Sequence, residues 1–466
     1  METTRQGVNM ALISAIVAVA TIGGLLFGYD SGAVNGTQGG LTAEFGLSDA
    51  QLGFTVGVLL IGCAVGAFFA GRLADAIGRR TVMIMAAALF VVGALIQGVT
   101  ETHAIFVVAR FAGGLAVGAA SVLSPLYISE VAPANIRGRL TTVQQVMIIS
   151  GLTAAFVVNY FLAQAAGSSL GEIGGTKAWR WMYLAQAAPA VIFLIALLFI
   201  PESPRYLVSK KRDEEAHKVL TRLFGSEEAT RKVADIRRTF SDDHRPRLRD
   251  VTAPGTGFRP IVWAGIMLAT FQQFVGINII FYYGETLWKL AGISEEVALE
   301  RNILSGVVSI AAVVAALLVI DKIGRKPLLI IGSTGMTVTL AALTWAFSGA
   351  ATDAAGNLAL GPTAGWIALV AANLYVVFFN FSWGPVMWVM LGEMFPNQMR
   401  GSALAVAGLA QWGANYLVVQ SFPSMASGLG LATVYALYTV AALISIFLVK
   451  KLINETKGME LEDMVG

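Results

Sequence analysis

Twelve long apolar stretches constrain the fold of this chain more than any other feature of its sequence. Each is about 20 residues long, the length at which a helix crosses a hydrocarbon core of about 30 Å. Only 13% of the residues are charged and 56% are hydrophobic, too little charge to cover a soluble protein of 466 residues. We therefore predict an all-α membrane protein with spans near residues 10–33, 51–71, 81–100, 104–126, 142–166, 180–200, 260–289, 302–320, 327–349, 364–391, 401–424 and 428–450.

A polar stretch divides these spans into two groups of six. It covers residues 201–259 and has helix-like patterns, such as the one at 214–224. We predict an N-terminal six-helix bundle over 1–200, a small cytoplasmic helical linker over 201–259, a C-terminal six-helix bundle over 260–450 and a cytoplasmic tail over 451–466. The alternative for the linker is a disordered basic segment.

Basic residues gather in alternate connections between the spans, whereas the other connections carry mostly acids. The positive-inside rule places the basic connections and both termini in the cytoplasm, as expected for a multi-pass protein of the inner membrane. This arrangement also accounts for the net charge of +3, which therefore gives no indication of a nucleic-acid partner.

A charged motif occurs once in each half. Asp75-x-x-Gly-Arg79-Arg80 follows span two, and Asp321-x-x-Gly-Arg325 follows span eight. An acid and an Arg-Gly pair separated by seven residues also follow both span four and span ten. The repeat predicts two pseudo-symmetric bundles, with a ligand site near the midplane between them.

These charged residues also form a candidate cytoplasmic gate, because ion pairs at helix ends can hold one conformation closed and must break to open it. Each exposed pair is worth about 0–1 kcal/mol, so the network would matter more than any single bridge. The alternative is that the charges only set the topology. The candidate gate residues are Asp75, Arg79, Arg80, Glu130, Arg137, Glu202, Asp321, Arg325, Glu393 and Arg400.

Three amides lie within seven residues of span seven: Gln272, Gln273 and Asn278. An unpartnered amide in a bilayer costs several kcal/mol, so the cluster indicates a lined cavity, or else amides that join neighbouring helices. On an ideal helix Gln273 and Asn278 point roughly 140° apart. They can meet on one ligand only if the helix is broken, and Gly276 is the expected place.

The motifs together closely resemble the sugar porter family of the major facilitator superfamily. The matching segments are Gly71–Arg80, Pro201–Arg205, Gln272–Asn278, Asp321–Arg325 and Asn454–Gly458, and the resemblance covers nearly the whole chain. It implies transport by alternating access and a gate that stabilises an outward-facing state.

The resemblance also implies a set of sugar contacts. Amides would bind vicinal hydroxyls, and flat aromatic faces would cover the C–H face of the ring. Ser309 departs from the family, since many members carry an amide there, and Asn380 stands where some relatives have Glu. The implied contacts are Phe27, Gln145, Gln272, Gln273, Asn278, Tyr282, Trp388, Gln411, Trp412 and Asn415.

Asp30, at the end of span one, is expensive in a membrane unless it is paired or protonated, and Arg110 in span four is the expected partner. An Asp that exchanges an Arg for a proton can couple proton movement to a conformational change. Proton-coupled relatives resemble this chain in having both residues. The alternative is a permanently charged structural pair in a facilitator.

We therefore expect a secondary active transporter, and not an enzyme, that imports an aldohexose or pentose together with a proton. The alternatives are a passive sugar uniporter, a proton-coupled myo-inositol or polyol symporter, and a membrane sensor that retains the transporter fold. The sequence suggests no cofactor, metal site or nucleic-acid partner, and we expect a monomer whose partners are sugar, protons and the lipid bilayer. Cys63 is the only cysteine, so an internal disulfide is excluded.

Overall fold

The computed structural model describes residues 8–133, 137–242, 248–253, 257–352, 358–396 and 399–457. Side chains are not described for residues 137–142, 239–242, 248, 250, 351 and 352. Arg137 of the candidate gate therefore has no described side chain.

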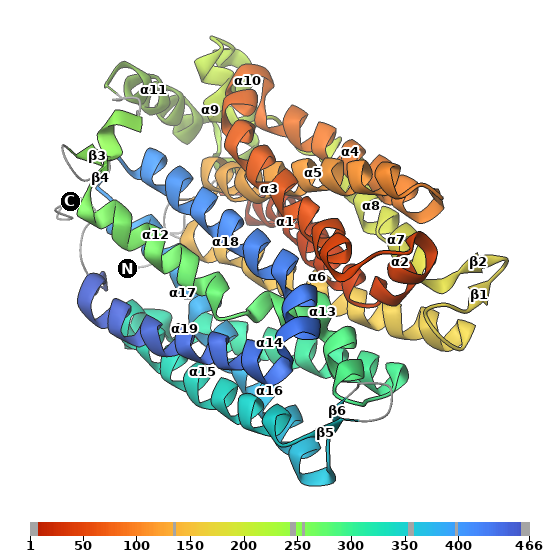
Figure 1. Ribbon diagram of the computed structural model, residues 1–466. Helices are drawn as coiled ribbons and strands as arrows, with labels where there is room; N and C mark the ends of the chain where they lie inside the picture. Colours follow the sequence, from red (N-terminus) through yellow and green to blue (C-terminus); the bar gives the residue numbers. More distant parts are fainter. Residues whose placement is uncertain are drawn as a thin grey trace.

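The first half contains α1 (Met10–Asn35), α2 (Gln38–Phe45), α3 (Asp49–Ile77), α4 (Arg79–Val99), α5 (His103–Val131), α6 (Arg137–Ala166), α7 (Ala178–Ala185) and α8 (Ala187–Leu197). The second half contains α12 (Pro260–Phe274), α13 (Ile277–Leu290), α14 (Glu295–Ile323), α15 (Arg325–Ser348), α16 (Pro362–Phe381), α17 (Trp383–Met394), α18 (Arg400–Leu429) and α19 (Leu431–Leu452). Figure 1 shows these halves as two helical bundles side by side.

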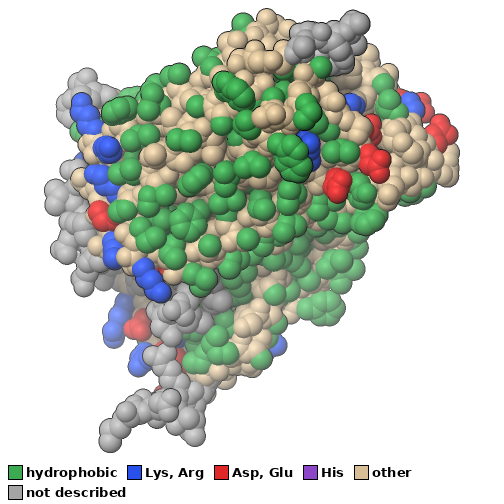
Figure 2. Space-filling view, turned by 90° about the horizontal axis from the view of Figure 1, so that it is seen from below, with side chains coloured by type: hydrophobic (Ala, Val, Ile, Leu, Met, Phe, Trp, Pro, Cys, Tyr) green, Lys and Arg blue, Asp and Glu red, His purple; other side chains and the backbone are tan. Residues whose placement is uncertain are grey.

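All twelve predicted membrane spans are confirmed, because the described residues contain twelve helical segments that are long and apolar enough to cross a bilayer. Three of these segments are built from two helices each: α7 with α8, α12 with α13, and α16 with α17. Figure 2 shows the broad apolar surface, with a basic margin along one edge and acidic side chains near the opposite edge.

The segment between the halves contains α9 (Pro204–Ser209), α10 (Asp213–Phe224), α11 (Ser226–Asp242) and the 3-10 helix η1 (Leu248–Val251). The described residues also include three short antiparallel strand pairs: β1 (Glu172–Ile173) with β2 (Thr176–Lys177), β3 (Thr252–Ala253) with β4 (Gly257–Phe258), and β5 (Ala351–Thr352) with β6 (Leu358–Ala359).

The two ends of the molecule differ in charge. We call the end that carries α9–α11, the α3–α4 junction and the α14–α15 junction the basic end (Figure 1). α1 starts at this end, where the Asn9 N–H donates to the Leu223 carbonyl of α10 at 2.8 Å. The β1–β2 and β5–β6 hairpins lie at the opposite end (Figure 1).

The breaks inside three spans have local causes. Span seven breaks at Gly276, as predicted, because this residue has φ +81°, a left-handed conformation that glycine adopts without strain. The breaks at Gln186 and Ser382 were not predicted. Pro189 and Pro385 each lie three residues further on, where the missing N–H removes one helical hydrogen bond.

Candidate substrate and coupling site

The helix break at Gly276 brings the span-seven amides into one chain of hydrogen bonds. Gln272 Nε2 donates to the Trp383 carbonyl at 3.0 Å, and Gln273 Nε2 donates to Gln272 Oε1 at 3.0 Å. Asn278 Nδ2 lies 2.7 Å from both Gln273 Oε1 and Asn415 Oδ1. The geometric expectation that Gln273 and Asn278 converge across a broken helix is therefore confirmed.

One aromatic pair joins the two halves at α18, the helix that also carries Asn415 of the amide chain. Trp412, on α18 between Gln411 and Asn415, packs edge to face against Phe27 of α1, with ring centroids 5.6 Å apart. Gln411 is buried, and its Oε1 has no hydrogen-bond partner in the structure. An unpaired buried acceptor beside an aromatic face can accept a ligand hydroxyl.

Tyr282 connects the amide segment to the first half. Its hydroxyl accepts a hydrogen bond from Ser31 Oγ of α1 at 3.0 Å, and both side chains are buried. Because Ser31 follows Asp30 directly, a shift of α1 at Asp30 would also displace Ser31 and change its hydrogen bond to Tyr282.

Six of the ten predicted sugar contacts have no described hydrogen bond to the amide chain: Phe27, Gln145, Tyr282, Trp388, Gln411 and Trp412. No hydrogen bond or ring contact described in the structure links Gln145 of α6 or Trp388 of α17 to it. Gln145 is half-buried, and Trp388 is 41% exposed. The preceding residue, Gln144, is buried, and both of its amide atoms lack a partner.

The two departures from the family pattern contact one another. Asn380 Nδ2 lies 3.2 Å from Ser309 Oγ, while Asn380 Oδ1 is buried without a partner. The smaller serine thus leaves one amide oxygen unpaired in the second half.

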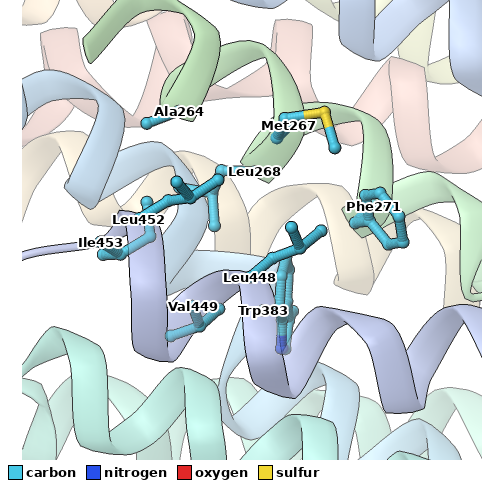
Figure 3. A pocket seen from close by; sticks show the side chains of 9 residues that line it. All are labelled: Ala264, Met267, Leu268, Phe271, Trp383, Leu448, Val449, Leu452 and Ile453. Atoms are coloured by element: carbon cyan, nitrogen blue, oxygen red, sulfur yellow. The ribbon is translucent and has the colours of Figure 1, made fainter. Parts of the chain in front are cut away.

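A small apolar pocket lies between α12, α17 and α19, where Leu268, Phe271 and Trp383 face Leu448 and Leu452 (Figure 3). Its volume is about 10 Å³, roughly that of one water molecule, and all of its lining side chains are apolar or aromatic. It is therefore too small and too apolar to hold a sugar.

Asp30 and Arg110 form a buried ion pair between α1 and α5. Arg110 Nη1 donates to the two carboxylate oxygens at 2.8 and 3.0 Å, and each side chain is only 1% exposed. Arg110 Nη2 also donates to the Val56 carbonyl at 3.3 Å, but Nε has no partner. Arg110 is thus the partner expected for Asp30, whereas the coupling role of the pair stays a prediction.

A contact between the halves that the sequence analysis missed lies at the end of the molecule opposite the basic end. Asn35 Nδ2, at the end of α1, donates to the Phe281 carbonyl at 2.9 Å, and Asn35 Oδ1 accepts from the Glu285 N–H at 2.9 Å. Gln38 of α2 forms hydrogen bonds with the Tyr282 carbonyl and the Thr286 hydroxyl.

We call this contact the α1–α13 joint, defined by Asn35, Gln38, Phe281, Tyr282, Glu285 and Thr286. Asn302 of α14 reinforces it, because Asn302 Nδ2 donates to Asn35 Oδ1 at 2.7 Å. A sequence signal existed, since Asn35 and Gln38 are amides at the end of an apolar span. Their partners are mostly backbone groups of a distant helix, which no sequence pattern reveals.

The candidate gate residues at the basic end pair within each half. Arg79 lies 2.8 Å from Asp75 and 3.1 Å from Glu130, and in the second half Arg325 lies 3.0 Å from Asp321 and 2.8 Å from Glu393. None of the ion pairs described in the structure crosses between the halves at this end. The network is therefore positioned to fix each bundle internally, and its gating role stays a prediction.

The remaining gate residues bind backbone groups. Arg80 Nε donates to the Leu197 carbonyl at 2.9 Å, and Arg400 Nη2 donates to the Phe395 carbonyl at 3.0 Å. Glu202 Oε1 accepts from the Arg80 N–H at 3.1 Å, so it caps the start of α4.

The second half repeats this cap with a residue that the gate prediction did not include. Glu455 accepts from the backbone N–H groups of Arg325 and Lys326 at 3.0 and 2.9 Å. Burial of the Glu455 carboxylate would raise its pKa, but the N–H groups of Lys457, Arg325, Lys326 and Thr456 outweigh burial and hold that pKa below its usual value.

Hydroxyls next to the two caps also match. Ser203 Oγ donates to Glu130 at 2.5 Å, and Thr456 Oγ1 donates to Glu393 at 2.6 Å. The pseudo-symmetry of the halves therefore extends from the helix order to individual hydrogen bonds.

Two helical bundles, a broken helix where they meet, a cluster of amides and aromatic side chains, and a buried ion pair are together the features of a membrane transporter. The structure is similar to the inward-open conformation of the xylose transporter XylE from E. coli, with a TM-score of 0.82, 36% identity, and coverage of 97% of this chain and 99% of that chain. The fold is that of the major facilitator superfamily.

The family model described as "Sugar (and other) transporter" matches residues 16–465, and the chain belongs to this family of sugar transporters. It is 44% identical to the glucose transport protein of Synechocystis over 98% of this chain and 97% of that protein. It is 36% identical to the D-xylose-proton symporter of Escherichia coli K12, over 98% and 96% of the two chains. The resemblance drawn from the motifs is confirmed, and the protein is a multi-pass membrane transporter, not an enzyme.

Proposed function

We propose that this transporter imports an aldohexose or pentose together with a proton by alternating access. The observation that carries the proposal is the combination of a neutral amide chain across the Gly276 break with the buried Asp30–Arg110 pair. Neutral amides both donate and accept, which suits a polyhydroxy ligand better than an ion. The names of the two relatives, a glucose transport protein and a D-xylose-proton symporter, support the same substrate class.

In this proposal the sugar binds mainly to the second half. Gln272, Gln273, Asn278 and Asn415 exchange part of their mutual hydrogen bonds for sugar hydroxyls, and Trp412 covers the C–H face of the ring. Gln411 Oε1 can accept a sugar hydroxyl without breaking an existing hydrogen bond, because it is already unpaired. Gln145 and Trp388 would join only as the halves move together around the sugar.

The proton acts on the Asp30–Arg110 pair. Protonation removes the charge of Asp30, which releases Arg110 and leaves a buried cation that favours rearrangement of α1 and α5. Ser31 carries this movement to Tyr282 through their hydrogen bond, beside the sugar site.

We further propose that the basic end faces the cytoplasm, in agreement with the positive-inside rule. The α1–α13 joint then closes the outer side, which fits an inward-facing state, as does the similarity to the inward-open xylose transporter. The basic-end clusters would meet across the halves only in the outward-facing state.

Uptake of labelled glucose and xylose into proteoliposomes, with and without an inward proton gradient, tests the proposal. We expect accumulation above equilibrium, with matched acidification of the interior, only when the gradient is present. Equal equilibration with and without the gradient would instead identify a passive uniporter. If neither sugar moves, myo-inositol and other polyols are tested in the same vesicles, and transport of these alone would replace the monosaccharide proposal.

A further inference from the structure

The α1–α13 joint contains a carboxyl group that has no part in the proposed cycle. Glu285 lies on α13, and its side chain is only 2% exposed. Its backbone N–H donates to Asn35 Oδ1 of the first half at 2.9 Å, so the residue is fixed at the contact between the halves.

The hydrogen bonds of the Glu285 carboxylate are incomplete. Oε1 lies 3.3 Å from Lys289 Nζ, whereas Oε2 is buried without a partner. Lys289 is 42% exposed and also lies 3.9 Å from Glu295 of α14. One half-exposed ammonium group is thus shared by two carboxylates.

The other groups near Glu285 carry no charge. From α1, α2 and α14 the neighbouring side chains of the joint are the amides Asn35, Gln38 and Asn302. Lys289 and Glu295 are therefore the charged groups that act on Glu285 within the part of the chain that the structure describes. Glu295 also links this cluster to the first half, because its Oε1 accepts the Ser169 N–H at 2.5 Å.

A buried carboxylate with one unpaired oxygen is unfavourable, because it loses hydration without gaining a full set of donors. Opening the joint would separate α13 from α1 and α2 and return water to the carboxylate. The closed joint therefore favours the neutral acid over the carboxylate more strongly than the open joint does.

We propose that Glu285 binds a proton as the α1–α13 joint closes and releases it when the joint opens, which makes it a second proton site besides Asp30. The proton enters and leaves on the same side of the membrane, so the number of protons transported per sugar does not change. Acid on that side favours the closed joint. The inference depends on alternating access, but it does not depend on whether Asp30 couples proton and sugar transport.

The test measures how often the joint is open at different pH values. Spin labels are attached to cysteines introduced at the exposed positions Asp49 and Glu300, one in each half, after the substitution Cys63→Ser. Double electron–electron resonance then gives the open and closed populations between pH 5 and pH 8.5. The starting variant carries Asp30→Asn, so that Asp30 contributes no titration.

In the Asp30→Asn protein we expect the open-to-closed ratio to rise about tenfold between pH 5 and pH 8.5. This is the change produced when a single group binds its proton about ten times more tightly in the closed state than in the open state. Adding Glu285→Gln should keep the joint closed and make the ratio independent of pH. The matched control Glu296→Gln, an exposed acid in the first turn of α14, should leave the dependence intact.

Glu285→Asp retains an acid and should retain the pH dependence, which separates titration from a general disturbance of the joint. Thermal unfolding and size-exclusion chromatography establish that each variant is folded. A ratio that does not depend on pH in the Asp30→Asn protein, or an unchanged dependence after Glu285→Gln, would overturn the proposal. Failure of proton-driven accumulation in the wild type would refute symport alone, without affecting this result.

Discussion

The substitution Asn278→Ala tests the sugar site most directly. Asn278 Nδ2 donates to the side chains of Gln273 and Asn415, residues that are 4% and 1% exposed, so its removal leaves two buried acceptors without this donor. In the proposed site, the variant would also lose the hydrogen bonds from Asn278 to the sugar. Because the two acceptors lose their donor with and without sugar, only part of that cost affects binding.

We expect a net loss of about 1–3 kcal/mol in binding free energy, which corresponds to a roughly 5- to 150-fold increase in Kd. Isothermal titration calorimetry with the transported sugar, on purified protein, measures the change. Asn373→Ala is the matched control, because this span-ten amide bonds to Ser305 and to the Leu369 carbonyl of its own helix. Equal sugar affinity in the wild type and both variants would refute the proposal that the sugar binds at Asn278.

Three further substitutions test other parts of the structure. Asp30→Asn should abolish accumulation of sugar above equilibrium while exchange between preloaded pools continues; full accumulation in proteoliposomes would exclude the coupling role. Asn35→Ala removes the hydrogen bonds to Phe281 and Glu285 and should raise the open population of the α1–α13 joint several-fold in spin-label distance measurements. Glu455→Gln should lower the thermal unfolding temperature at pH 7. The pKa of Glu455 is held below its usual value, so the carboxylate stabilises the fold at pH values above that usual value. This stabilisation is lost as the pH falls through the lowered pKa. The difference in unfolding temperature between the wild type and Glu455→Gln should therefore shrink at about pH 3. An equal difference at both pH values would contradict that reasoning.

The sequence predicted the elements whose signals are local. A run of apolar residues defines a span by its length alone, and a glycine among amides marks a break, so the twelve spans and the Gly276 break follow from short stretches of sequence. The breaks at Gln186 and Ser382 also had a local cause in Pro189 and Pro385. Prolines are tolerated inside many membrane helices, however, as Pro125 inside α5 and Pro423 inside α18 show.

The features that were missed depend on backbone partners far away in the chain. Asn35 bonds to groups more than 240 residues away, and Glu455 caps a helix that begins 130 residues earlier. A side chain that binds a backbone N–H or carbonyl needs no particular residue type as its partner. Its sequence pattern therefore identifies a polar group that must be satisfied, but not where its partner lies.

In the proposed cycle, the arrangement along α1 would let a proton and a sugar act on one movement from separate binding sites. Asp30 pairs with Arg110 inside the first half, Ser31 bonds to Tyr282 beside the sugar amides, and Asn35 holds the joint at the far end of the helix. All three residues lie on one uninterrupted helix, because α1 runs from Met10 to Asn35. We therefore expect a change at Asp30 that tilts α1 to disturb both Tyr282 and the joint, and a change in sugar occupancy to act on Asp30 through the same contacts. Coupling of this kind is reciprocal, so any proton-dependent change in sugar affinity requires an equal sugar-dependent change in proton affinity.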